Sequence, residues 1–340
     1  MRELTFVEPG RVEWTDAPEA RLEGPDDALV RAVAVTTCDL DHAFVQGTVP
    51  IPGPFPLGHE FVADVVAVGD AVRNVRPGQR VVVPFQISCG RCDRCTRGQT
   101  GACRAVPHRS AYGLGPIGGT QWGGAFADLL RVPFADAMLL PLPDGVAPEI
   151  VACASDNLCD GWRAVAPYLR GDAAGAEVLV LGGEARSIGL YAVAAARALG
   201  ASRVVYQDAD ADRRSVAAAL GAEVVAERAH RLGRFAVTVD ASNDAEGLAC
   251  AIRSTDAWGT CTCVGVFFAD VALPMLEMYG KGIHFVTGRA NARADMPDVL
   301  RHVADGSLDP RPVMTGVHPW ESAPEVLLAG PMKPVFLRGA

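Results

Sequence analysis

The sequence predicts an α/β protein in two parts, a β-rich first half and a doubly wound parallel sheet in the second half. Three observations carry this prediction. The chain has 340 residues, more than one hydrophobic core usually organises. Up to about residue 143, short apolar runs are broken by Gly and Pro, as in a barrel or sandwich. From about residue 157, apolar strands alternate with helical runs, as in a parallel sheet wound by helices.

The individual elements follow from local patterns. In the first half, turn sequences such as GPDD, PGPFP and RPGQR separate the short strands, the clearest of which cover 28–35, 61–69 and 80–85. In the second half, a continuous apolar strand at 176–183 precedes a helical run at 187–200, and a strand at 203–208 precedes another helix at 212–221. Further strands are expected at 223–225, 236–240 and 260–266, a helix and turn at 296–310, and a last strand at 334–337.

The composition excludes several classes of protein. The residues are 49% hydrophobic and 21% charged, as in ordinary globular proteins, and the net charge of −9 argues against a nucleic-acid surface. The start, MRELTFVEPG, lacks the apolar core of a signal peptide, and no apolar run approaches the ~20 residues that cross a bilayer. Ten cysteines without a secretory signal indicate reduced thiols, metal binding and a cytoplasmic location. The expected partner is a small-molecule substrate.

Four cysteines follow one another at the spacing C-x2-C-x2-C-x7-C in a loop rich in Gly and Arg. They are Cys89, Cys92, Cys95 and Cys103. Four thiolates at this spacing can close a tetrahedron around one zinc ion and leave no position for water, so the site would be structural. Neighbouring arginines offset the thiolate charge. Two disulfides in a secreted protein and an iron–sulfur cluster are the alternatives.

A second metal site is indicated by two residues at strand ends. Cys38 follows one strand and His59, within Gly58-His59-Glu60, opens another. Together they can supply two ligands, whereas an open zinc site needs three. Taken alone, a Cys is more often a small core residue, and a His is more often a satisfied polar residue.

These motifs, in this order and at these separations, resemble the zinc-containing medium-chain alcohol dehydrogenases over nearly the whole chain. The resemblance includes the opening VEPGRVEWTDAPE and the segment GGAFADLLRVP. It implies a GroES-like catalytic domain at 1–156 and 286–340 and a Rossmann coenzyme domain at 157–285. It also implies that Cys38 and His59 bind a catalytic zinc with Glu60 as an alternating ligand, and that Phe85, Trp122 and Leu40 line the substrate pocket.

The third ligand is expected in CASDNLCDGWRAV, at 153–165. Relatives use Cys, Asp or Glu here, and aligning the pair Gly161-Trp162 selects Asp156. Cys153 and Cys159 are nearby competitors, and a helix N-cap is the alternative role for Asp156.

The strand–glycine–helix junction should cradle the pyrophosphate of a dinucleotide on helix N-terminal amides. Asp208, 19 residues after Gly189, ends the second strand and can accept hydrogen bonds from the adenosine ribose. Its charge would repel a 2′-phosphate, so NAD is preferred over NADP. The expected cofactor residues are Gly182, Gly183, Ser187, Ile188, Gly189, Asp208 and Arg213, with Val264, Gly265, Val266 and Lys333 placed at the nicotinamide and pyrophosphate by family position.

Two features depart from the family pattern. Gly182 to Gly189 spans seven positions where G-x-G-x-x-G spans five, and the longer loop carries Glu184, which Arg186 can offset. Leu40 stands where a Ser or Thr usually begins the proton relay, so His42 is expected to offer another proton route.

The function implied is a zinc-dependent transfer of hydride between NAD(H) and an alcohol, polyol or amino-cyclitol, or the corresponding carbonyl. Because of Leu40, a reductase of an iminium or conjugated C=C bond is an alternative function. Because of the altered glycine loop and Leu40, a non-catalytic zinc-binding relative is a second alternative. The resemblance implies two zinc ions per chain and a homodimer or homotetramer.

Overall fold

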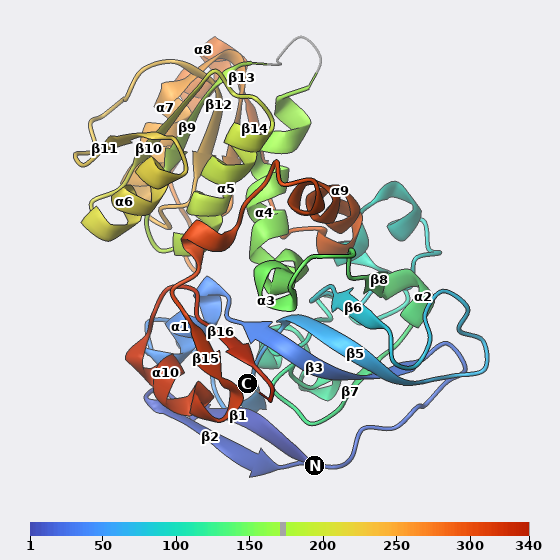
Figure 1. The fold of residues 1–340 in the computed structure, drawn as a ribbon. Coiled ribbons are helices and arrows are strands. Elements are labelled where there is room, and N and C mark those ends of the chain that lie inside the picture. Colours follow the sequence, from blue (N-terminus) through green and yellow to red (C-terminus); the bar gives the residue numbers. More distant parts are fainter. Residues whose placement is uncertain (171–174, 340) are drawn as a thin grey trace. The chain divides into compact units, whose positions relative to one another are not determined.

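A computed structural model describes residues 1–170 and 175–339, and the chain divides into two compact units (Figure 1). Unit 1 contains Met1–Cys159, Asn291–Asp305 and Met314–Ala340, and unit 2 contains Asp160–Ala290 and Gly306–Val313. The α/β fold class is confirmed, with a β-rich unit and a unit built on a parallel sheet. The sequence patterns did not predict that the short segment Gly306–Val313 returns to unit 2.

Unit 1 is built on a three-stranded sheet, β2-β1-β4, and a larger sheet in the order β15-β16-β3-β5-β6-β8, in which β7 also pairs with β3. Within β3, alternate side chains such as Val30, Ala32 and Ala34 are buried and Arg31 is exposed, because successive residues of a strand point to opposite faces. The strands are β1 (Arg2–Glu8), β2 (Arg11–Asp16), β3 (Ala28–Thr36), β4 (Phe55–Pro56), β5 (Glu60–Val68), β6 (Arg80–Val83), β7 (Leu130–Val132), β8 (Leu140–Pro141), β15 (Val317–Pro319) and β16 (Val335–Leu337).

The helices of unit 1 are short. They are α1 (Asp39–Val45), α2 (Ala135–Met138), α3 (Pro148–Val151), α9 (Ala292–Ala304) and α10 (Ala323–Ala329), with 3-10 turns that include η1 (Cys95–Arg97), η2 (Thr100–Ala102), η4 (Thr120–Trp122) and η5 (Ala152–Ser155). Helix α4 (Asn157–Val165) carries the chain from unit 1 into unit 2.

Helix α1 begins directly after β3, and its start is fixed by hydrogen bonds. Cys38 is the N-cap residue: its thiol accepts from the backbone N–H of Leu40 at 3.5 Å, and its own N–H donates to Asp41 Oδ2 at 3.0 Å. This reciprocal arrangement is a capping box with a thiol in place of the usual hydroxyl. It holds the Cys38 side chain in one place at the end of β3.

Unit 2 is a six-stranded, entirely parallel sheet in the order β11-β10-β9-β12-β13-β14, with helices between the strands. The strands are β9 (Glu177–Leu181), β10 (Arg203–Gln207), β11 (Glu223–Val225), β12 (Phe235–Asp240), β13 (Thr255–Cys263) and β14 (His284–Thr287), and the helices are α5 (Arg186–Ala198), α6 (Ala211–Ala219), α7 (Ala245–Ser254) and α8 (Met275–Lys281). The strand–helix alternation predicted for this half is confirmed, although β13 begins five residues before the expected 260.

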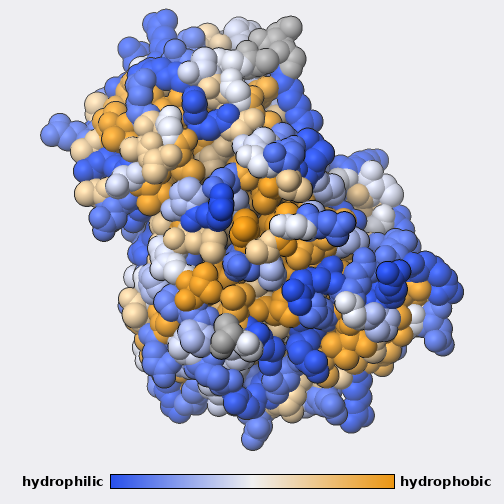
Figure 2. Space-filling view, in the orientation of Figure 1, coloured by the Kyte–Doolittle hydropathy of each residue, from blue (hydrophilic) through white to orange (hydrophobic). Residues whose placement is uncertain are grey.

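The carboxyl ends of four central strands lie in register: Leu181 is opposite both Gln207 and Asp240, and Asp240 is opposite Cys263. The residues that follow these four positions therefore share one edge of the sheet, which is where ligands bind in open parallel sheets. Hydrophilic and hydrophobic residues are interspersed over the face drawn in Figure 2. None of the helices in the described part of the chain is long and apolar enough to cross a membrane.

Candidate metal centres and cofactor site

One cluster of possible metal ligands lies in unit 1 where three segments converge. Cys38 comes from the end of β3, His59 from the residue before β5, and Asp156 from the junction of η5 and α4. One ligand atom from each lies within 4.8 Å of the others, and all three residues are buried. Residues about 100 positions apart in the sequence are thus brought to a single point.

The imidazole of His59 is fully buried, and neither ring nitrogen has a hydrogen-bond partner among the described residues. Nδ1 lies 3.7 Å from Asp41 Oδ1, and Nε2 lies 3.4 Å from Asp156 Oδ2. Burial lowers the pKa of His59, but the carboxylates of Asp41 and Asp156 outweigh it and raise the pKa overall. An imidazole held between two carboxylates, with both nitrogens unsatisfied, is suited to binding a cation through one nitrogen.

The donor set fits zinc. A thiol, an imidazole and a carboxylate are the kinds of ligand that zinc takes in sites with an open position. Burial, and next the carboxylates of Asp156 and Asp41, raise the pKa of Cys38 well above its ordinary value. A cation at this point would stabilise the thiolate and the surrounding carboxylates together.

Glu60 and Lys333 form a fully buried ion pair beside this cluster. Glu60 Oε1 also accepts the backbone N–H of Asn157 at 2.7 Å, and Lys333 Nζ also donates to the carbonyl of Thr37 at 2.6 Å. Burial raises the pKa of Glu60 to about 8 despite the opposing effect of Lys333. The expectation that Lys333 meets the cofactor pyrophosphate stays a prediction; in the structure its ammonium group pairs with the buried carboxylate of Glu60 and serves as its counter-ion.

The other residues predicted around the metal have different surroundings. Phe85 is buried with its ring centroid 5.6 Å from that of His59, and Leu40 lies in the first turn of α1 beside Cys38. His42 lies against the end of α10, where a Cβ on Gly330 would be 2.7 Å from His42 Cε1. Trp122, in η4, has the guanidinium of Arg131 6.0 Å from its ring.

The competing cysteines are tied to their own segment. Cys159 Sγ donates to the carbonyl of Ala154 at 3.0 Å, and Cys153 Sγ to that of Ile150 at 3.5 Å. Neither belongs to the group that contains Asp156. Asp41, whose carboxylate lies beside His59, was not predicted as a site residue, although its position three residues after Cys38 in a capping box was a usable signal.

The second cluster contains the four cysteines of the loop, whose sulfur atoms lie within 4.8 Å of one another. Backbone amides point at the sulfurs: Cys89 N and Ala105 N donate to Cys103 Sγ, both at 3.4 Å, and Arg104 N donates to Cys92 Sγ at 3.5 Å. The bond from Arg104 is the main reason that the pKa of Cys92 falls to about 6. All ten cysteines are free thiols, so the disulfide alternative is not realised. The set fits a structural zinc ion.

The loop between β9 and α5 is shaped by two glycines that approach other chain segments closely. A Cβ on Gly182 would lie 2.3 Å from the hydroxyl of Tyr206, and one on Gly183 would lie 2.5 Å from the carbonyl oxygen of Ser242. The amides of Glu184 and Ala185 donate to the carbonyls that follow β12. The side chain of Glu184 is paired with Arg186 at 3.5 Å.

The remaining residues expected at the cofactor lie along the same edge of the sheet. Ser187, Ile188 and Gly189 form the buried first turn of α5, and Val264–Val266 follow β13 directly. Asp208 follows β10, is 2% exposed, and has both carboxylate oxygens in hydrogen bonds with neighbouring side chains. Arg213 donates to both of its oxygens, at 2.7 and 2.8 Å, and the Tyr206 hydroxyl donates to Oδ2 at 2.7 Å. Burial opposes ionisation of Asp208, but these hydrogen bonds outweigh it and lower the pKa.

Comparison with known proteins agrees with this arrangement. Residues 24–144 match the alcohol dehydrogenase GroES-like domain, and residues 187–305 match the zinc-binding dehydrogenase domain. A probable zinc-binding alcohol dehydrogenase of Mycobacterium tuberculosis is 31% identical over 95% of this chain and 83% of its own length. The structure of alcohol dehydrogenase TADH from Thermus sp. ATN1 is 31% identical with a TM-score of 0.87, over 99% of this chain and all of that one. A zinc-binding dehydrogenase from Sinorhizobium meliloti bound to NADP is 26% identical with a TM-score of 0.80, over 99% and 98% of the two chains.

The fold and the clusters together define a two-domain, zinc-binding dehydrogenase. The chain belongs to the zinc-containing medium-chain alcohol dehydrogenase family and is an oxidoreductase.

Proposed function

We propose that this enzyme transfers hydride between NAD(H) and an alcohol, polyol or amino-cyclitol, or the corresponding carbonyl, at a zinc site formed by Cys38, His59 and Asp156. The observation that carries the proposal is that these three buried side chains lie together, and that among the described residues neither ring nitrogen of His59 has a hydrogen-bond partner. We also propose a structural zinc ion in the four-cysteine loop, which gives two zinc ions per chain.

The residues have separable roles in this proposal. Bound zinc supplies Lewis acidity toward a substrate oxygen, and bound NAD supplies the hydride acceptor. Asp41 orients His59 from the side opposite Asp156. The carboxylate of Glu60 is bound by Lys333 and by the backbone N–H of Asn157, beside the metal cluster. From this position it can act as an alternating zinc ligand. Phe85 packs beside His59 and excludes water from that side.

Metal content and turnover test this assignment together. Cys38→Ala and His59→Ala should each remove one of two zinc ions and abolish the oxidation of a panel of alcohols, while the zinc in the cysteine loop stays bound. Cys153→Ala is the matched control, because it replaces a buried cysteine of the same unit that lies outside the cluster. Full activity in Cys38→Ala or His59→Ala would remove the zinc site from the mechanism.

We propose NAD as the preferred cofactor, since a carboxylate at Asp208 repels a 2′-phosphate. The bidentate pair with Arg213 offsets part of that charge, so the preference should be modest. Fluorescence titration should give tighter binding of NADH than of NADPH, and Asp208→Asn should reduce the difference. Tighter binding of NADPH by the unmodified enzyme, as the ligand of the Sinorhizobium meliloti relative would suggest, would overturn the proposal.

One observation favours a second candidate function. Leu40, in the first turn of α1 beside Cys38, cannot pass a proton, and His42 lies against α10. In a reductase of an iminium or conjugated C=C bond, the proton is delivered differently from the way it is in an alcohol dehydrogenase. Reduction of such substrates by NADH, with no oxidation of any alcohol in the panel, would select this alternative.

We further propose a cytoplasmic homodimer or homotetramer. None of the ten cysteines of the protein forms a disulfide, which suits a reducing compartment. Strand β14 is an edge strand, and the neighbouring surface of unit 2 exposes Leu276 and Tyr279 by 84% and 86%. Exposed apolar side chains beside an open sheet edge are suited to association with a second copy.

A further inference from the structure

A pocket of about 500 Å³ lies within unit 1, between the cysteine loop and the N-terminal turn of α9. The two sides are tied together, since the backbone N–H of Gly101 in η2 donates to Asn291 Oδ1 at 3.0 Å. The pocket has no role in the proposed redox site, because its wall contains none of the residues Cys38, His59 and Asp156.

Arg293 brings to the wall of this pocket a positive charge that forms no ion pair with the described residues. Its Nε donates to the carbonyl of Ala137 at 2.6 Å, but within residues 1–170 and 175–339 its two Nη atoms have no acceptor and no carboxylate partner. Burial lowers the pKa of Arg293, and no opposite charge offsets that effect. A half-buried guanidinium with two free donor nitrogens favours an anion with at least two oxygens.

Two hydroxyl groups in the same wall are also unsatisfied. Ser88 and Thr100 are 1% and 6% exposed, and neither Oγ atom has a hydrogen-bond partner in the described part of the chain. Buried hydroxyls are normally hydrogen-bonded, so their donors are available to a ligand.

The helix end adds to the same electrostatic field. Helix α9 has 13 residues, and Arg293 and Ala294, in its first turn, line the pocket. Its N-cap Asn291 uses its side-chain oxygen on Gly101 and makes no cap hydrogen bond to α9. The backbone N–H of Ala294 already donates to the carbonyl of Asn291 at 2.8 Å, so the helix end contributes through its dipole, whose positive end favours an oxyanion.

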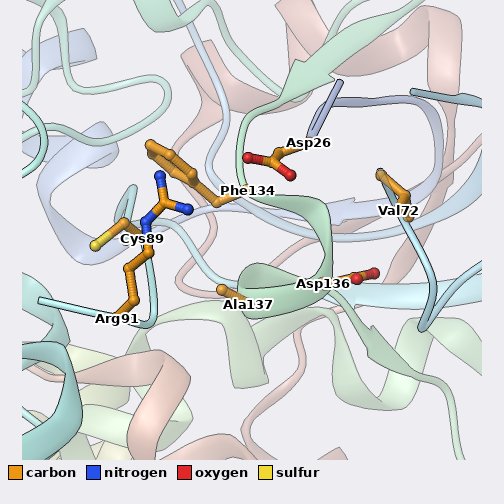
Figure 3. Close-up of a pocket in the computed structure, with 7 residues that line it drawn as sticks. All are labelled: Asp26, Val72, Cys89, Arg91, Phe134, Asp136 and Ala137. Atoms are coloured by element: carbon orange, nitrogen blue, oxygen red, sulfur yellow. The ribbon is translucent and has the colours of Figure 1, made fainter. Parts of the chain in front are cut away.

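One carboxylate, that of Asp136, also belongs to the wall, but it is already satisfied. Its oxygens accept the backbone N–H of Arg73 at 2.9 and 3.0 Å and that of Asn74 at 2.7 Å. Figure 3 shows this carboxylate pointing away from Cys89, in a smaller neighbouring pocket of about 130 Å³. That smaller pocket is lined by two carboxylates, those of Asp26 and Asp136, and by one arginine, Arg91.

We propose that the pocket between the cysteine loop and α9 is a binding site for a small oxyanion, a phosphate or carboxylate group, held by the Arg293 guanidinium, the hydroxyls of Thr100 and Ser88 and the N-terminus of α9. The site is independent of the redox function. Because Cys89 and Cys95 also line the pocket, a bound anion stabilises the fold of the cysteine loop.

Calorimetric titration of the zinc-replete enzyme with inorganic phosphate, at constant ionic strength, tests the proposal. The wild-type enzyme should bind phosphate saturably, and Arg293→Gln should weaken this binding at least about tenfold, as expected for loss of a charge-assisted hydrogen bond. Arg301→Gln is the matched control, because Arg301 is an exposed arginine of the same helix, paired with Asp298. It should bind phosphate like the wild type.

A second variant guards against a folding defect in Arg293→Gln. Thr100→Val removes a hydroxyl that has no protein partner, so it should leave the melting temperature unchanged or higher while weakening phosphate binding severalfold. The absence of saturable binding by the wild type would overturn the proposal. So would binding that survives both Arg293→Gln and Thr100→Val, since the phosphate would then lie elsewhere, for example at α5.

Discussion

At the scale of single residues, a carboxylate outside the ligand set lies beside His59. Asp41 Oδ1 lies 3.7 Å from His59 Nδ1, while its Oδ2 accepts the N–H of Cys38. Asp41→Asn keeps the shape and removes the charge, so we expect zinc affinity at the Cys38 cluster to fall by about 10–100-fold. Zinc content after dialysis against graded chelator measures this, and the zinc of the cysteine loop is the internal control. Unchanged retention of both ions would show that Asp41 does not support the site.

A second residue-scale prediction concerns pH and Asp240, which is completely buried at the end of β12. Its oxygens accept hydrogen bonds from the Ser242 hydroxyl at 2.5 Å and the Cys263 thiol at 3.3 Å. Burial raises the pKa of Asp240, and the bonds from Ser242 offset this only in part. The stability that this group contributes is therefore full below its unfolded pKa and is lost as the pH rises through the higher folded pKa.

Asp240→Asn cannot titrate, so its free energy of unfolding relative to the wild type should improve as the pH rises from about 5 to about 8. At the lower end of this range the two proteins should agree within about 1 kcal/mol, since an amide can keep both hydrogen-bonded positions. Urea unfolding at several pH values measures the difference. A difference that stays constant or shrinks with rising pH would contradict the assignment.

At the scale of elements, the junction of β9 and α5 depends on the absence of a side chain at Gly182. A Cβ there would lie 2.3 Å from the Tyr206 hydroxyl and 2.4 Å from Asp208 Oδ2. Gly182→Ala should therefore displace the Tyr206–Asp208–Arg213 network, lower the free energy of unfolding by about 1–3 kcal/mol and weaken NADH binding. Gly280→Ala on α8 is the control, because a Cβ there meets nothing within 4 Å and alanine favours a helix. Equal behaviour of the two variants would show that the junction tolerates a side chain.

At the scale of the whole molecule, the proposed assembly depends on the apolar surface of α8. Leu276→Glu should convert the oligomer to a smaller species, because it places a charge in a surface that would be buried between copies. Light scattering coupled to size exclusion measures the mass. Leu328→Glu, on α10 of unit 1 and 39% exposed, should leave the mass unchanged. A monomeric wild-type protein, or a Leu276→Glu variant with the wild-type mass, would remove α8 from the interface.

Local patterns in the sequence are enough to predict the fold class, many of the strands and helices and the position of the cysteine loop, because these depend on the period of apolar residues and on short local spacings. The strand–helix order of the second half and the strand that Cys38 follows both come from such local patterns.

The pairing of the buried charged groups depends on the three-dimensional fold. Glu60 and Lys333 are 273 residues apart, and Arg213 neutralises Asp208 through a side-chain contact that no spacing rule predicts. The physical reason is the same for both pairs: a buried charge needs a partner from whichever segment the fold brings beside it, and periodicity carries no information about that partner.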